Sequence, residues 1–266
     1  IGLRICHADH SPISHKPARL SQTGPAPMKW LADTMHTTAG HDAHHTGHRA
    51  AWLSDNMYTI ACEDRDHPEW HLGTRHAAVW AFEVEWDPAP ARRVLGGLLP
   101  GYRRQPHITL AYGGLLDTEF DAASHERDVK SLTDLMTPGW SLTIRATGWG
   151  TFTTTPYLAV ADPQGWMQQA HEELCRNDPR RCLDHYVPHI TLGHHAVRRR
   201  LTEVTERLGT LPHDERWRCE SVSLLRYETC TIAGPLTRIG HVDAAGWHDG
   251  PAFRLDESPT KNRDTT

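Results

Sequence analysis

The chain has 266 residues and a formal net charge of -5, from 28 Lys and Arg against 33 Asp and Glu. This length is ample to bury a hydrophobic core as one domain or as two small lobes. No stretch approaches eighteen consecutive apolar residues, which excludes a transmembrane helix. The acidic balance argues against an extended nucleic-acid surface, which needs clustered Lys and Arg. Because the first thirty residues show no secretory signal, we expect a cytoplasmic protein.

Composition divides the chain into three parts. Residues 1–76 hold eleven of the 21 histidines and few apolar runs, so they are expected to form an N-terminal extension. Residues 243–266 are polar and lack periodicity, which is typical of a tail. The segment His41–His48 has enough imidazoles for a divalent metal but matches no zinc signature, and we interpret it as a solvated loop. Residues 77–242 carry the informative patterns.

An internal repeat organises residues 77–242. Each half shows a strand, an Asp-Pro pair that opens a helix, the strand Pro-His-Ile-Thr-Leu and a further helix. In the first half these segments are 77–85, 87–88, 88–100, 106–110 and 119–136. In the second half they are 157–161, 162–163, 163–174, 188–192 and 197–208. Further strands are expected at 140–149, 219–227 and 229–242. The pattern predicts an α+β protein of two similar lobes.

The repeated pentapeptide places polar groups on one face of a strand. Because side chains alternate, His107 and Thr109 point one way while the Ile between them points the other, and His189 and Thr191 repeat this arrangement. If a two-fold relation brings the strands together, two imidazoles and two hydroxyls converge. One His-x-Thr is usually an ordinary strand pair, but two copies in the same structural context favour catalysis.

Two histidines suit a reaction that removes one proton and delivers another near neutral pH. In phosphodiester cleavage, a neutral histidine takes the proton of the attacking oxygen and a protonated one gives its proton to the leaving oxygen. Thr109 and Thr191 then donate hydrogen bonds to the non-bridging phosphate oxygens. We expect no metal or other cofactor at this site. Which of His107 and His189 is the base stays open.

The paired motifs resemble the signature of the 2H phosphoesterase superfamily, which includes the bacterial RNA 2′,3′-cyclic phosphodiesterase, also called 2′-5′ RNA ligase. The likeness covers residues 77–242 and includes Thr147–Phe152, similar to the glycine-then-Phe stretch between the family's motifs. It implies two pseudo-symmetric lobes, each an antiparallel sheet with flanking helices, around a central cleft. It also implies metal-independent hydrolysis of a cyclic phosphodiester, such as a 2′,3′-cyclic phosphate of a nucleotide or an RNA end.

Four further residues are candidates for substrate binding. Many relatives have an Arg five positions after the second motif histidine, where this chain has His194, whose counterpart in the first half is Tyr112. Simple alternation turns both away from the motif face unless the strand ends or bulges there. Phe152 and Tyr227 can stack on a base. The pair Arg103-Arg104 can either steer a phosphate or lie on an ordinary exposed surface.

Other activities remain open at this point. The same residues suit a 2′-5′ RNA ligase, a hydrolase of a cyclic or oligonucleotide messenger, or a nucleotide-binding module without catalysis. A metal-dependent enzyme centred on His41–His48 is a further alternative. The expected partner is a small nucleotide or RNA end, with no membrane and no extended nucleic-acid surface, and the protein is expected to be a monomer.

Overall fold

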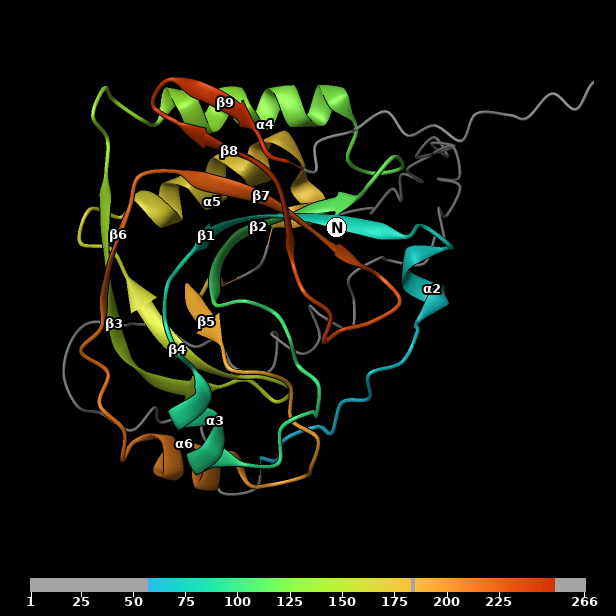
Figure 1. Cartoon of the computed structure of the whole chain (residues 1–266), viewed down its shortest axis with the longest axis vertical. Coiled ribbons are helices and arrows are strands. Elements are labelled where there is room, and N and C mark those ends of the chain that lie inside the picture. The colour runs from blue at the N-terminus through green and yellow to red at the C-terminus, as the bar shows by residue number, and fades with distance from the viewer. Residues whose placement is uncertain (1–56, 183–184, 252–266) are drawn as a thin grey trace, which may run out of the picture.

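The computed structural model describes residues 57–182 and 185–251 (Figure 1), so the segment His41–His48 lies outside the described residues. Nine strands in this part form one antiparallel sheet in the order β6-β3-β4-β5-β2-β1-β7-β8-β9. Their bounds are β1 His76–Glu83, β2 His107–Leu115, β3 Leu142–Thr151, β4 Pro156–Ala161, β5 His189–Thr191, β6 Arg216–Cys219, β7 Val222–Glu228, β8 Thr237–Asp243 and β9 Gly246–Asp249. The helices are α2 Pro68–His71, α3 Ala89–Leu95, α4 Ala122–Asp134, α5 Trp166–Asn177, the short 3-10 helix η1 Pro179–Arg181, and α6 Leu201–Leu208.

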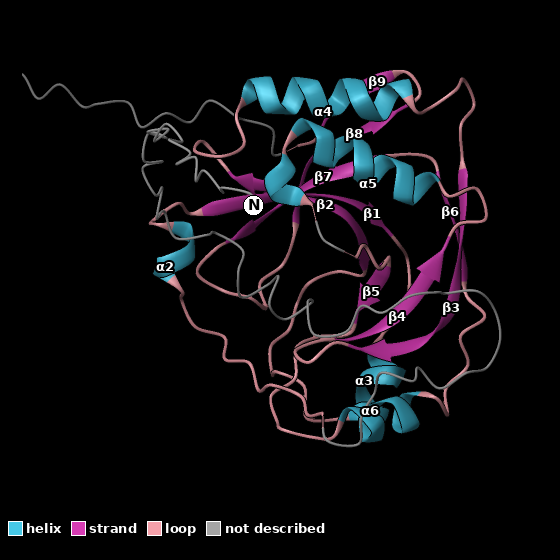
Figure 2. Ribbon diagram, turned by 180° about the vertical axis from the view of Figure 1, so that it is seen from behind, coloured by secondary structure: helices cyan, strands magenta, loops and turns pink. Residues whose placement is uncertain are grey.

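The fold is α+β, as the repeat predicts, and its two halves join at the neighbouring strands β2 and β5. Helices α4 and α5 pack on each other at one end of the molecule, and α3 and α6 pack together at the other end (Figures 1 and 2). Helix α5 belongs to the second repeat but packs against β2 of the first. The repeats are therefore interlocked by their helices as well as by the sheet.

One face of the sheet forms the main hydrophobic core with α4 and α5. Trp80 and Phe82 of β1, and Ile108 and Leu110 of β2, are fully buried in this core. Ile190 of β5 joins them, also without exposed surface. The apolar residue of each His-x-Thr motif thus faces the helices, and the alternation of the strand turns the histidine and threonine to the opposite face.

The two Asp-Pro pairs open helices, as predicted. Asp87 Oδ1 accepts a hydrogen bond of 2.9 Å from the backbone N–H of Ala89 at the start of α3. Asp162 accepts backbone hydrogen bonds from Trp166 and Met167 at the start of α5, at 2.8 and 3.0 Å. These carboxylates satisfy N–H groups that have no partner within the helix.

The fold includes residues on both sides of 77–242, the range expected from the sequence. Strand β9 lies inside the stretch 243–266 that was expected to be a tail, because a four-residue polar strand gives no periodic signal. On the other side, residues within 57–76, expected to belong to the extension, are bound to the fold. Backbone N–H groups of Thr59, Ile60 and Cys62 donate to carbonyl oxygens of Arg199, Thr153 and His195.

Within residues 57–182 and 185–251, no helix is long and apolar enough to cross a bilayer.

Candidate functional site

The two motif histidines have the same local geometry. Nδ1 of His107 lies 2.7 Å from the carbonyl oxygen of Gln105, and Nδ1 of His189 lies 2.7 Å from that of Val187. A carbonyl oxygen only accepts, so Nδ1 carries the proton in both neutral rings. The Nε2 atom of each ring is therefore the one that can take up or deliver a proton.

The strand register places the four motif side chains together. Ile108 of β2 pairs with Ile190 of β5 in an antiparallel contact. Positions that flank such a pair face one another, which sets His107 beside Thr191 and Thr109 beside His189. The two histidines are then diagonal neighbours, roughly 7–8 Å apart along the sheet. Side chains of diagonal neighbours on one face can reach a common ligand between them.

Both imidazoles are held in the neutral form. The pKa of His107 is lowered to about 4, mainly by burial; the hydrogen bond to Gln105 opposes this shift, and the charges of Arg104 and His189 add to it. Burial also lowers the pKa of His189, again opposed by its backbone hydrogen bond. A neutral Nε2 is a proton acceptor. A bound phosphate anion favours the charged form of an adjacent histidine, which allows that histidine to act as the acid.

Two aromatic rings surround His189. The ring of Phe152, just after β3, lies 5.2 Å from the imidazole in an edge-to-face arrangement, and Tyr157 of β4 lies 5.2 Å away on a tilted plane. The ring of Tyr157 also covers Gly150, where a Cβ atom would come within 2.5 Å of that ring. The glycine in this stretch is thus needed for the close approach. Phe152 and Tyr157, two of the aromatic residues near the motif strands that the sequence suggests for base stacking, thus both lie beside a motif histidine.

A β-bulge brings Tyr112 to the motif face. The β1–β2 register shifts between Trp80 and Ala81, so that Thr109 pairs with Ala81 and Tyr112 pairs with Val79. Ala81 and Val79 lie on the same face of β1, and Tyr112 therefore shares the face of Thr109. Simple alternation would have turned it away.

Of the pair Arg103-Arg104, the structure brings Arg104 close to aromatic side chains near the motifs. Its guanidinium lies 4.5 Å from the centre of the Tyr227 ring, a cation–π contact. Its charge is also one of the causes that lower the pKa of both His107 and His194. In the sequence Arg104 comes just before the first motif, but the direction of its side chain could not be predicted. Arg104 thus contacts the Tyr227 ring, and its charge acts on His107 and His194.

Buried polar atoms line this region without a hydrogen-bond partner. In the part of the chain that the structure describes, they include Nε of Arg104 and the hydroxyl of Tyr112. Burial raises the pKa of the Tyr112 hydroxyl, so it is a neutral donor. Unsatisfied buried polar groups are costly and call for an explanation such as a ligand.

His194 lies at the edge of the site. Its Nδ1 is 3.3 Å from the hydroxyl of Thr155, and its ring meets that of Tyr102 at 5.5 Å. Burial and the charge of Arg104 lower its pKa to about 4, with opposing contributions from the Ile232 backbone and Asp64. His194 is therefore uncharged at neutral pH. It does not supply the positive charge of the Arg that many relatives have at this position.

Two side chains behind the motif strand hold its backbone. The hydroxyl of Tyr186 donates to the carbonyl oxygen of Thr109 at 2.9 Å, and Nδ1 of His171 lies 2.7 Å from that of Leu110. The rings of Tyr186 and His171 stack with their centres 4.2 Å apart. Both contacts thus provide partners for backbone carbonyl groups of β2.

A pocket of about 330 Å³ adjoins His194 through the Tyr102 ring. The side chain of Arg92 lies over that ring at 5.2 Å and donates from Nε to the carbonyl oxygen of Leu192. The lining residues are Arg92, Gly96, Gly97, Leu98, Leu99, Gly101, Tyr102 and Leu192.

One family model and several solved structures are similar to this chain. The model of the family described as the 2′-5′ RNA ligase superfamily matches residues 81–230. The structure of TT0787 of Thermus thermophilus is 16% identical, with a TM-score of 0.45, covering 65% of this chain and 100% of that one. Escherichia coli LigT complexed with NADP+ is 18% identical, with a TM-score of 0.43, covering 63% and 96%. LigT complexed with 3′-AMP is 16% identical, with a TM-score of 0.42, covering 64% and 97%. No curated protein matches the sequence.

Proposed function

The chain belongs to the 2′-5′ RNA ligase superfamily of phosphoesterases, and on this premise we propose that it hydrolyses a 2′,3′-cyclic phosphate of a nucleotide or RNA end. The observation that carries the proposal is the matched pair of motif histidines. Each has Nδ1 held by a backbone carbonyl and Nε2 left for proton transfer. The pairing of Ile108 with Ile190 supports this proposal, because it makes the two motif histidines diagonal neighbours across β2 and β5.

The reaction uses one histidine as base and the other as acid. One Nε2 takes a proton from water while the water oxygen forms a bond to phosphorus. The bond from phosphorus to one ribose oxygen breaks, and the other Nε2 delivers a proton to that oxygen. Thr109 and Thr191 donate hydrogen bonds to the non-bridging oxygens as negative charge grows there. No step needs a metal or another cofactor.

Arg104 neutralises the bound phosphate in this proposal. It is the cation near His107 and His194, and its Nε has no partner within the described residues. A guanidinium can donate two parallel hydrogen bonds to phosphate oxygens. Tyr227 holds the guanidinium plane by the cation–π contact. The positive charge that many relatives place after the second motif thus comes from before the first motif in this chain.

In this proposal, aromatic side chains around the motifs bind the nucleoside. Phe152 lies against His189, and Tyr227 lies under Arg104, so either ring is within reach of a base next to the phosphate. Tyr112 shares the motif face and can donate from its hydroxyl. His194, neutral and at the edge of the site, contributes a hydrogen bond rather than a charge.

The test is turnover of nucleoside 2′,3′-cyclic phosphates, cyclic dinucleotides and RNA with a cyclic end, each with EDTA present. We expect ring opening of the 2′,3′-cyclic substrates, and the monophosphate product identifies the oxygen that leaves. Binding of these compounds without turnover would indicate a nucleotide-binding module instead. Turnover of the cyclic dinucleotides alone would indicate a messenger hydrolase. Activity that disappears in EDTA contradicts the two-histidine mechanism.

A further inference from the structure

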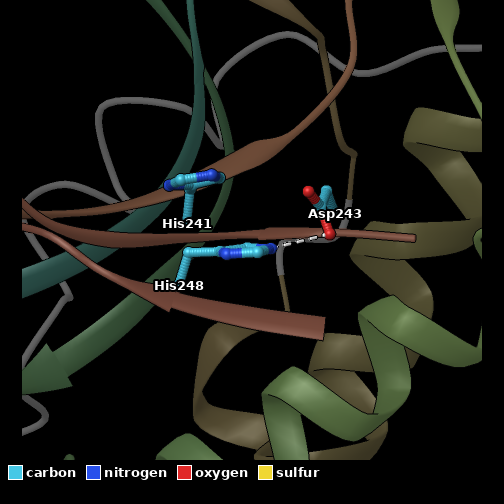
Figure 3. Close-up of side chains that lie close together, drawn as sticks. All are labelled: His241, Asp243 and His248. Atoms are coloured by element: carbon cyan, nitrogen blue, oxygen red, sulfur yellow. Dashed lines mark ion pairs between the residues drawn. The ribbon is translucent and has the colours of Figure 1, made fainter. Parts of the chain in front are cut away.

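Three potential metal ligands lie together on the β8–β9 hairpin, outside the motif site. Figure 3 shows His241 and Asp243 of β8 with His248 of β9, and one potential ligand atom from each lies within 4.8 Å of the other two. The two imidazole rings are stacked 4.8 Å apart with an angle of 15° between their planes. Nε2 of His248 lies 3.0 Å from Oδ1 of Asp243.

The register of the hairpin produces this cluster. His241 and His248 are direct cross-strand partners, and Asp243 pairs with Gly246 at the turn. Because side chains alternate, Asp243 lies on the same face as His241, two residues earlier. The Trp247 ring of the opposite face lies 4.4 Å from that of His125 in α4. The hairpin is thus anchored to the helix layer while the three ligand residues face away from it.

The cluster shares a face of the sheet with the motif residues. The register links Thr109 to Ala81, Ala81 to Ser223, and Ser223 to His241 across neighbouring strands. With strands about 4.8 Å apart, three steps separate the cluster from Thr109 by roughly 14 Å. An ion held there is too far away to touch a phosphate bound between the motif histidines. It belongs to a separate site on the same face.

The local charges allow a cation to bind. Arg238 is the positive group beside His241, but it forms an ion pair with Glu83. Oδ1 of Asp243 accepts a hydrogen bond of 2.7 Å from the backbone N–H of Ala245, which holds the carboxylate in place at the turn. Neutral imidazole and charged carboxylate are the forms that bind metals.

We propose that His241, Asp243 and His248 bind one divalent transition-metal ion, with Zn²⁺ the best match. Two imidazoles and one carboxylate are a set that Zn²⁺ accepts, with water in the remaining position. Ligand atoms about 2.1 Å from a tetrahedral ion lie about 3.4 Å from each other, so atoms within 4.8 Å need to move little. His248 is exposed, so its ring can turn toward the ion without disturbing the core. Through these ligands the ion links the edge strand β9 to β8.

The experiment is titration of the full chain with ZnCl₂ by calorimetry. His44→Gln and His45→Gln are introduced first, so that the His41–His48 segment does not dominate the signal. In this background we expect one bound Zn²⁺ per chain. His248→Gln should weaken that binding by at least about tenfold. The matched control is His213→Gln, which removes one exposed imidazole outside the cluster and should leave binding unchanged.

A second readout is thermal stability. An ion that binds the folded chain raises the melting temperature, so Zn²⁺ should raise it in the background chain and in His213→Gln but not in His248→Gln. Equal Zn²⁺ affinity in the His248→Gln and His213→Gln chains would overturn the proposal, as would no binding in the background chain. In either case, the His248–Asp243 contact is only an ion pair. Because Zn²⁺ binding is measured without substrate, and phosphodiesterase activity in EDTA, the two proposals fail independently.

Discussion

Ile108 of β2 is paired with Ile190 of β5, and both side chains are fully buried under the helices. This pair is the contact at which the two repeats become one sheet. Each isoleucine stands between the histidine and the threonine of its own motif. The packing that stabilises the junction therefore also sets the spacing of the proposed catalytic groups.

Shortening Ile190 to Ala should destabilise the fold. Removing buried methyl groups from a packed core costs about 2–5 kcal/mol, from lost burial and the cavity left behind. Urea denaturation of the Ile190→Ala chain should show this loss in the free energy of unfolding. The control is Val187→Ala, because Val187 is 37% exposed and its truncation should cost far less. Equal stability of the two variants would show that the junction is not tightly packed.

Replacing Arg104 should weaken phosphate binding. Arg104→Gln removes the cation near His107 and His194, and kcat/KM for a nucleoside 2′,3′-cyclic phosphate should fall by about tenfold to a hundredfold. A hydrogen bond to a charged group is worth about 1.5–3 kcal/mol, which corresponds to this range. Arg103→Gln is the matched control, since its side chain is exposed and it is the preceding residue. If both changes have the same small effect, Arg104 does not touch the phosphate.

The pH dependence should be displaced toward acid. Catalysis needs one neutral and one protonated histidine, and burial lowers the pKa of His107 to about 4 and that of His189 below its usual value. The free enzyme loses its protonated histidine as the pH rises through these values, so kcat/KM should be highest below pH 6.5. The profile of kcat should lie at higher pH, because the bound phosphate raises the pKa of the acid. Steady-state rates between pH 4 and 9 test the pH profiles of kcat/KM and of kcat. A kcat/KM optimum at pH 8 contradicts the lowered pKa values of the two histidines.

His195 should make the fold sensitive to acid. It is 1% exposed, its Nε2 lies 2.9 Å from the Thr151 hydroxyl, and burial lowers its pKa to about 4. The unfolded chain binds a proton near pH 6.5 and the folded chain only near pH 4. The stability contributed by neutral His195 is therefore complete above pH 6.5 and lost as the pH falls to 4. Between these values the slope is about 1.4 kcal/mol per pH unit for each such group.

The measurement for His195 is urea denaturation at pH 4.5, 5.5 and 6.5. The His195→Gln chain should show a shallower dependence of unfolding free energy on pH than the wild type. His213→Gln, at an exposed position, should keep the wild-type slope. Identical slopes in all three chains would mean that His195 titrates normally in the folded state.

The repeat allowed much of the fold to be predicted. Both Asp-Pro helices, both motif strands and the α+β class follow from local patterns, and each is confirmed. The bulge that turns Tyr112 to the motif face was not predictable, because it depends on pairing with β1. Strand β9 was missed because its hydrogen bonds to β8, rather than any periodicity, define it.

The candidate site, like the fold, could be predicted from the sequence only in part. His107 and His189 are marked by their repeated motif, but the direction of Arg104 depends on how the loop before β2 meets Tyr227. The three proposed zinc ligands have no metal-binding spacing in the sequence. Only the register of the hairpin makes His241 and His248 partners. Contacts between segments, rather than local preferences, decide these features.

The most direct test of the account is hydrolysis of nucleoside 2′,3′-cyclic phosphates by His107→Ala and His189→Ala in the presence of EDTA. Each variant should lose at least about a hundredfold in turnover while the wild type keeps its activity, because general acid and general base each contribute about that much or more. Far-UV circular dichroism should confirm that both variants fold. Full activity in either folded variant would contradict the paired-histidine mechanism.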